Sequence, residues 1–158
     1  MKFQADREVL HDAISFVVRL LSPKPQLPQL SGVMIEADKN QVTLSVFDYE
    51  VSARATIAAA VDSPGKVLVQ GRLLAEIVSK LPGDTVSLAL NETRLGLTSG
   101  TAKFALSSMT TNDYPEIPTF PGSSGSVNAS DFSHAVSQVA VAASREEVTP
   151  VLTGVMLT

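Results

Sequence analysis

The chain contains no cysteine and no tryptophan, and only 5% of its 158 residues are aromatic. Without cysteine it has no disulfide framework, no thiolate metal site and no cysteine nucleophile. No run approaches the roughly 18 apolar residues that span a bilayer, and the N-terminus lacks the apolar stretch of a signal peptide. We therefore expect a cytoplasmic protein with no membrane partner and a core built mainly from aliphatic side chains.

Positive charge is also scarce, because the formal net charge is −4. A wholesale basic surface is thus excluded, and any role with nucleic acid must depend on a local patch of cations. Catalytic signatures are scarce too, since the chain has no Gly-rich phosphate loop and no Gly-x-Ser-x-Gly elbow. We expect a noncatalytic protein with no cofactor.

One pair of acids keeps an enzymatic alternative open. Asp48 and Glu50 are two residues apart, so they would share one face of a strand that continued through both. Paired carboxylates can hold Mg²⁺ for phosphoryl chemistry, as in a small metal-dependent nuclease. They stand, however, at a junction between two predicted strands with no third acid nearby in the sequence. A structural turn is therefore the favoured interpretation, and we expect no metal site.

What the chain does have is an internal repeat. Shifted by 122 positions, residues 5–36 align with residues 127–158, and nine of the 32 pairs are identical, whereas composition alone gives about two or three. A repeat of this size indicates a domain-sized unit used more than once. We expect a first domain over 1–112, a linker over 113–126 and a truncated second domain over 127–158. The first long strand of that second domain would be under way at Thr158, so we expect the natural protein to continue.

The first domain is predicted to contain the order β-α-β-β-β twice. Asp6 is a plausible N-cap for the first helix, and the prolines from Pro23 to Pro28 then force an extended connection. The expected elements are strands at 2–5, 30–37, 41–48 and 50–59 with a helix at 6–21, then strands at 66–70, 84–90, 93–98 and 102–107 with a helix at 71–80. This pattern predicts an α+β fold with antiparallel sheets and two helices on one face. A third helix, capped by Asn128, is expected over 128–143.

Seven short motifs then follow one another along the chain. They are Met1-Lys2-Phe3, the Pro-rich turn Pro23–Pro28, Phe47-Asp48-Tyr49-Glu50, Val69-Gln70-Gly71-Arg72, Lys80-Leu81-Pro82-Gly83, Phe104-Ala105-Leu106-Ser107 and Asp113-Tyr114-Pro115. Each motif alone is weak, but their order together with the repeat resembles the bacterial DNA polymerase III beta subunit family, the DNA sliding clamps. The resemblance covers the whole chain.

The resemblance implies a ring. Each subunit of the family has three such domains, and two subunits join head to tail, with the helices lining the hole and the sheets forming the outer wall. Double-stranded DNA would thread the homodimer whatever its sequence, while the polymerase and the clamp loader would bind the full-length protein. Such a sleeve needs diffuse attraction to phosphates rather than contacts with base edges.

The resemblance also points to residues that face DNA. Lys24 in the Pro-rich turn and Arg72 at the second helix start occupy positions where the family places a DNA-contacting cation. Further candidates on or beside the helices are Arg7, Arg19 and Lys80. The acidic Asp12 opposes them, and Glu146, Pro150 and Val151 stand where family members carry Gln and aromatic residues. We therefore expect a modest DNA surface, with ordinary solvated charges as the alternative.

For ring closure, the resemblance implies that the last strand of the first domain pairs with the other subunit, because an unpaired strand edge is a template for pairing. The candidate interface residues are Arg94, Lys103, Phe104 and Leu106, although Phe104 and Leu106 could equally be core. The chain alone is not expected to close a ring. A scaffold that uses the same module without encircling DNA stays open as a rival; an exposed, cation-lined helical face favours the clamp over the scaffold.

Overall fold

The computed structural model describes residues 1–112, 114–119, 122, 125–146 and 148–157. The chain divides into two compact units, Met1–Pro118 and Thr119–Thr158. The first unit thus runs past the boundary predicted at residue 112 and includes the start of the predicted linker. Asp113 of that linker and the final Thr158 lie outside the described residues.

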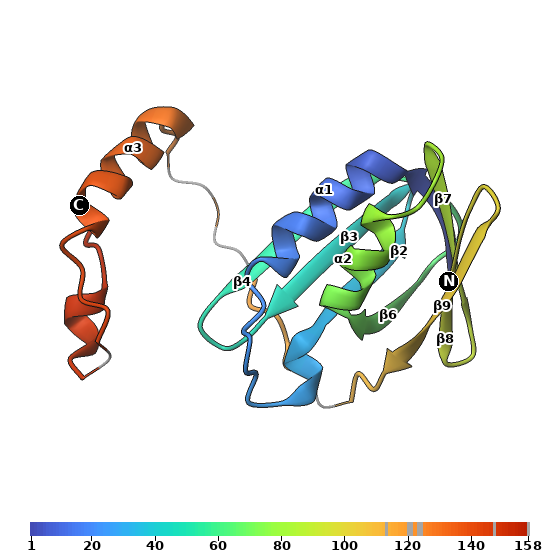
Figure 1. Ribbon diagram of the computed structural model, residues 1–158, viewed down its shortest axis with the longest axis horizontal. Helices are drawn as coiled ribbons and strands as arrows, with labels where there is room; N and C mark the ends of the chain where they lie inside the picture. Colours follow the sequence, from blue (N-terminus) through green and yellow to red (C-terminus); the bar gives the residue numbers. More distant parts are fainter. Residues whose placement is uncertain (113, 120–121, 123–124, 147, 158) are drawn as a thin grey trace. The chain divides into compact units, whose positions relative to one another are not determined.

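The first unit is built on a nine-stranded antiparallel sheet in the order β4-β3-β2-β6-β9-β8-β7-β1-β5 (Figure 1). The strands are β1 (Lys2–Asp6), β2 (Gly32–Asp38), β3 (Gln41–Phe47), β4 (Ser52–Ala58), β5 (Ala60–Ser63), β6 (Gly65–Gln70), β7 (Thr85–Asn91), β8 (Arg94–Ser99) and β9 (Ala102–Met109). Strand β9 joins the two halves of the sheet, because residues 102–107 pair with β8 whereas Ser108 and Met109 pair with β6.

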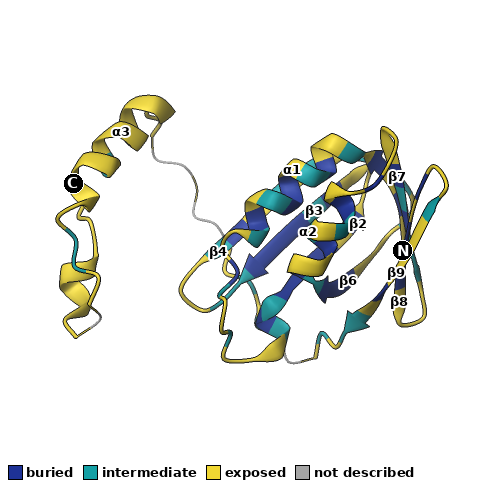
Figure 2. Ribbon diagram, in the orientation of Figure 1, coloured by how far each residue is buried: buried dark blue, intermediate teal, exposed yellow. Residues whose placement is uncertain are grey.

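Two helices, α1 (Arg7–Val18) and α2 (Gly71–Ser79), lie side by side on one face of the sheet (Figure 1). Asp6 caps α1 as predicted, since its Oδ1 accepts the Val9 N–H at 3.0 Å. The buried side of each helix faces the strands (Figure 2). This arrangement confirms the predicted α+β class with two helices on one face. No helix among the described residues is long and apolar enough to cross a membrane.

Two strands begin two residues later in the structure than the sequence predicted. The strand expected at 30–37 begins at Gly32, because η1 (Pro28–Ser31) forms a 3₁₀ helix before it. The strand expected at 50–59 begins at Ser52. The residues before it form a turn, in which Asp48 Oδ1 accepts the N–H groups of Glu50 and Val51 at 3.2 and 2.8 Å, and Tyr49 has a φ of 73°.

The first half also has one strand more than the predicted β-α-β-β-β order. Strand β4 ends at Ala58, and after Ala59 the chain forms the unpredicted strand β5, which pairs with β1. Strands β4 and β5 are consecutive in the chain but stand at opposite ends of the strand order. The strand is interrupted because the chain changes its pairing partner from β3 to β1. The alanines at 58–60 give no local signal of this change.

The second unit contains α3 (Ala129–Ala140) and η2 (Pro150–Thr153). Both elements begin and end 122 positions after α1 and η1, so the repeat holds for the secondary structure as well. Asn128 Oδ1 caps α3 as predicted by accepting the N–H groups of Ser130 and Asp131 at 2.9 and 3.2 Å. Residues 154–157 are not a strand, contrary to expectation, because no described strand pairs with them and a strand needs a hydrogen-bonded partner.

Residues 114–117 pack on the face of the sheet opposite the helices. On that face Ser45, Met34 and Leu68 form one cross-strand row over β3, β2 and β6, and all three are buried. None of the three belongs to the main core between helices and sheet. Half-buried Tyr114 lines a pocket beside Met34. The start of the predicted linker therefore covers a small second apolar cluster.

The hydroxyl of Tyr114 gives a test of this packing. Burial raises the pKa of Tyr114 to about 12 from its ordinary 10.0, against a smaller opposing effect of the Phe47 backbone. The stability associated with the neutral hydroxyl is thus fully present below pH 10 and is lost as the pH rises toward 12. We expect a loss of roughly 1–2 kcal/mol, allowing for partial exposure of the ring. Denaturation at about pH 9 and pH 11.5 measures it; an equal loss in Tyr114→Phe would contradict the assignment.

Candidate nucleic-acid interface

The candidate site is the surface of α1 and α2 that faces away from the sheet. It is exposed (Figure 2) and carries cations, acids and apolar side chains together. The cations on or beside it are Arg7, Arg19, Lys24, Arg72 and Lys80, the acids are Glu8, Asp12 and Glu76, and the exposed apolar residues are Val9, Phe16, Leu20 and Leu73. The surface is therefore open, as the clamp interpretation requires, but its charge is mixed.

Two arginines of this surface are bonded to the backbone at the ends of the helix pair. Arg7 Nε donates to the Gly83 carbonyl at 3.0 Å, which ties the start of α1 to the loop after α2. Arg72 donates through its guanidinium to the Leu21 carbonyl at 3.4 Å, which ties the start of α2 to the segment after α1. Both arginines thus have a positioning role in the fold, and part of their hydrogen-bonding capacity is already used.

Lys80 is paired with an acid. Its Nζ lies 2.7 Å from Glu76 Oε1, at the i,i+4 spacing of a helix surface pair. The hydrogen bond from Lys80 lowers the pKa of Glu76 below its ordinary value, so the Glu76 carboxylate is charged at neutral pH. A phosphate would have to compete with Glu76 for this lysine.

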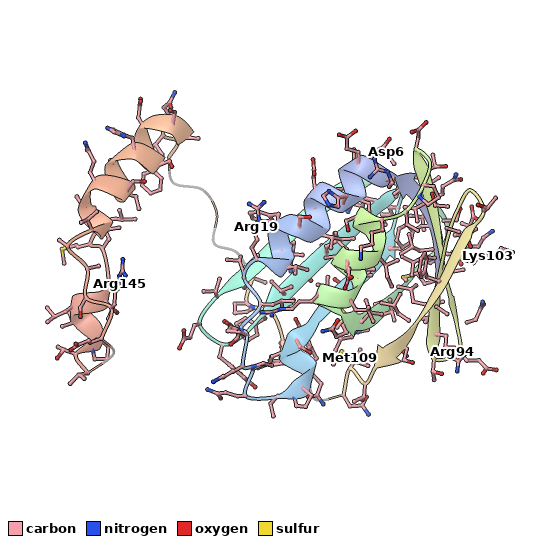
Figure 3. The ribbon with its side chains drawn as sticks, viewed as in Figure 1. Asp6, Arg19, Arg94, Lys103, Met109 and Arg145 are labelled. Atoms are coloured by element: carbon pink, nitrogen blue, oxygen red, sulfur yellow. The ribbon has the colours of Figure 1, made fainter. Side chains whose placement is uncertain are left out.

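Arg19 and Lys24 differ from the other three cations. Both are exposed, and neither side chain has an ion pair or hydrogen bond within the described part of the chain. Arg19 stands at the C-terminal end of α1 (Figure 3). Lys24 belongs to the Pro-rich turn and lines a shallow pocket that Asp48 and Glu50 also line. These acids reduce the local positive potential around Lys24 without forming a direct pair with it.

The enzymatic alternative required Asp48 and Glu50 to lie on one continuous strand, and they do not. Strand β3 ends at Phe47 and β4 begins at Ser52, so Asp48 and Glu50 do not share the face of one continuous strand. The Asp48 carboxylate instead closes the turn between them, which confirms the structural interpretation. Among the residues that the structure describes, no cluster of three His, Asp or Glu side chains could hold a metal ion.

The predicted subunit edge, β9, lies within the strand order rather than at its end, because β4 and β5 are the terminal strands. Along residues 102–107, however, β9 pairs only with β8, and no other described strand covers its second side. Leu106 is buried, at 3% exposure, whereas Phe104 is 42% exposed. Arg94 and Lys103 are exposed on the same two strands (Figure 3). The two candidate roles of Phe104 and Leu106 are thus separated: Leu106 is core, and Phe104 is accessible.

Comparison with known proteins decides which family this arrangement represents. Residues 1–118 match the family model of the DNA polymerase III beta subunit, N-terminal domain. The chain belongs to this family. The beta sliding clamp of Micrococcus luteus is 44% identical to it over 155 residues, which cover 98% of this chain and 50% of that protein. The beta sliding clamp of Streptomyces coelicolor is 40% identical over 157 residues, covering 99% and 42%.

A solved structure agrees with the sequence match. The crystal structure of the beta subunit from DNA polymerase of Streptococcus pyogenes superposes with a TM-score of 0.89 at 26% identity, over 98% of this chain and 43% of that one. This chain thus spans about half the length of the relatives it matches, or less. The resemblance predicted from the motifs and the repeat is confirmed, whereas the roles of individual residues stay predictions.

The second unit carries the residues that weakened the predicted DNA surface. Glu146, Pro150 and Val151 are all exposed, and so is Arg145 (Figure 3). What the sequence missed in the first unit is the exposed apolar group on the helices, above all Phe16 at 53% exposure. The signal was available, because Phe16 lies off the helical stripe formed by Leu10, Ala13, Ile14 and Val17.

Proposed function

We propose that this chain supplies the first domain and the start of the second domain of a DNA sliding clamp, the processivity factor of a replicative polymerase. In this proposal two full-length copies form a ring around duplex DNA in the cytoplasm. The observation that carries it is the repeat: α3 and η2 reproduce α1 and η1 at an offset of 122 residues, in a family whose named relatives are beta sliding clamps. A ring needs several copies of one domain. In this proposal the first domain covers 1–112, the linker covers 113–126, and the second domain begins with 127–158.

The proposed mechanism is topological and noncatalytic. A closed ring cannot leave a closed DNA circle, so long residence needs little binding energy. The mixed charge of the helix surface fits this requirement, because strong or base-specific contacts would hinder sliding. Arg19 and Lys24 are the best placed cations for phosphate contact, since their side chains have no partner among the described residues. Arg72, Arg7 and Lys80 would contribute charge while holding their present contacts.

Ring closure is proposed to use the open side of β9. Residues 102–107 offer unpaired backbone groups along this side, and a strand of the second subunit could add there by backbone hydrogen bonds. Phe104 is accessible for burial against that partner, while Leu106 anchors the strand in the core beneath it. Arg94 and Lys103 would lie on the rim of the interface. Polymerase and clamp-loader contacts are assigned to the full-length protein.

The decisive experiment separates topological linkage from affinity. The full-length protein is loaded by its clamp loader onto nicked circular DNA, and the circle is then cut once with a restriction enzyme. We expect the protein to stay on the circle through gel filtration and to be lost from the linear product, because only the circle prevents it from sliding off. A covalent block at both ends of the linear DNA is the control and should restore retention.

Other outcomes would contradict the proposal in distinct ways. Equal retention on circular and linear DNA would indicate ordinary affinity and no closed ring. No retention on either form would favour the scaffold, which uses the same repeated module without encircling DNA.

A further inference from the structure

The outer face of the first unit holds a buried row that the main core does not include. Arg54, Ser45, Met34, Leu68 and Met109 stand opposite one another across β4, β3, β2, β6 and β9. The three central side chains, Ser45, Met34 and Leu68, are 0%, 7% and 0% exposed. Because alternate strand residues point to opposite faces, these three point away from α1 and α2. Something other than the helices must therefore keep water from them.

Residues 114–117 cover the part of this row around Met34. Tyr114, Pro115 and Ile117 are half-buried and line one pocket together with Met34. The backbone N–H of Tyr114 donates to the Thr111 carbonyl at 3.2 Å, a local bond that does not reach a strand. The cover is thus held in large part by side-chain packing.

Two prolines prepare this segment for docking. Pro115 restricts Tyr114, and Pro118 restricts Ile117, to extended backbone conformations. A segment that is already extended loses less conformational entropy when it lies down on a sheet. Docking and release can therefore occur without refolding of the strands beneath.

Hydrogen bonding is incomplete where residues 114–117 contact the sheet. The Ser45 hydroxyl is buried and has no hydrogen-bond partner among the described residues, whereas the buried Tyr114 hydroxyl interacts with the Phe47 backbone. An unpaired buried hydroxyl destabilises the closed arrangement relative to one in which water reaches it. This cost acts at the segment itself and not in the core between the helices and the sheet.

We propose that residues 114–117 form a releasable latch on the face of the first unit opposite the helices, which sets where that unit ends. With the latch closed, the first compact unit ends at Pro118. With the latch open, its ordered part would end at Met109, where β9 ends. The nine residues in between add at most about 30 Å of reach at 3.3–3.6 Å per residue.

Methionine oxidation reports latch opening within the chain itself. Met34 lies under the latch at 7% exposure, whereas Met156 is 86% exposed and serves as an internal reference. Dilute hydrogen peroxide oxidises a methionine at a rate that follows its exposure, and peptide mass spectrometry gives both rates in one sample. We expect Tyr114→Ala to speed Met34 oxidation by about fivefold or more through local opening, with Met156 unchanged.

Amide exchange in α2 then separates the latch from general unfolding. The amides of Leu74 and Val78, two buried α2 residues, should keep their wild-type exchange rates in Tyr114→Ala. If they speed up by the same factor as Met34 oxidation, the segment unfolds with the whole unit and the latch proposal is wrong. If Met34 oxidation does not change, residues 114–117 do not cover it, and the proposal fails as well.

Removal of the hydroxyl alone tests the role of packing. Tyr114→Phe should leave Met34 oxidation nearly unchanged, because the ring that lies beside Met34 stays. Tyr49→Phe is the matched control, since Tyr49 is 55% exposed and lies in the β3–β4 turn; it should have no effect. An acceleration in Tyr114→Phe as large as that in Tyr114→Ala would overturn a latch closed by packing.

Discussion

Replacement of Leu74 by alanine is expected to lower the free energy of unfolding of the first unit by about 3–4 kcal/mol. Leu74 is fully buried in the core that the helices form with the sheet. The start of α2 is seated so closely that a Cβ on Gly71 would lie 2.6 Å from Leu21 Cδ1 and 2.8 Å from Val33 Cγ2. Since Leu74 is fully buried, its truncation removes apolar contacts and leaves a cavity in this core.

Leu73 offers the matched control for this substitution. It is the preceding residue of the same helix, has the same side chain, and is 46% exposed. Leu73→Ala should therefore cost less than about 1 kcal/mol. Urea denaturation followed by circular dichroism measures both variants, and equal losses would mean that α2 does not pack in the way described here.

Neutralisation of Arg19 and Lys24 together is expected to weaken DNA binding by the full-length protein about tenfold or more at low salt. Both side chains are exposed and unpaired among the described residues, so their charge is available to phosphates. The variant Arg19→Gln, Lys24→Gln should also reduce the slope of log affinity against log salt by about two, one for each lost phosphate contact. Retention on a closed circle should change little, because the ring holds it there.

The control for this variant removes the same amount of charge elsewhere. Lys39 lies in the β2–β3 turn and Lys66 on β6, both exposed and both outside the helix surface. Fluorescence anisotropy with a short linear duplex at several salt concentrations compares the two double variants. If Lys39→Gln, Lys66→Gln weakens binding as much, net charge and not the helix surface governs the attraction.

Local signals in the sequence were sufficient to predict the helices. Asp6 and Asn128 precede helical apolar patterns, and both cap their helices in the structure. Strand β5 was missed because nothing at Ala59 marks a break: the chain changes partner there, from β3 to β1, and pairing is a tertiary event. The predicted end of the first domain at residue 112 rested on the composition of the segment that follows it. Proline, serine and threonine suggested a free linker, while the apolar side chains of Tyr114 and Ile117 carried the contrary signal.

The residues of the candidate site were predictable from the sequence, but their hydrogen bonds and ion pairs were not. Helical position is enough to bring cations to one surface, and the spacing of Glu76 and Lys80 even indicates their pairing. The hydrogen bonds of Arg7 and Arg72 reach residues 76 and 51 positions away. Such contacts depend on how the two helices pack, which no local pattern contains. Five cations were thus predictable from the sequence, whereas the unpaired state of Arg19 and Lys24 follows only from the folded structure.

The pairing of the first strand with a late one has a consequence for synthesis on the ribosome. Lys2 of β1 pairs with Ala89 of β7, so the first residues made must wait for a partner that is translated much later. At roughly 5–20 residues per second this interval lasts on the order of 4 to 17 seconds. During it the side of β1 that will face β7 has no strand beside it, so its backbone hydrogen-bonding groups stay open to pairing with other chains.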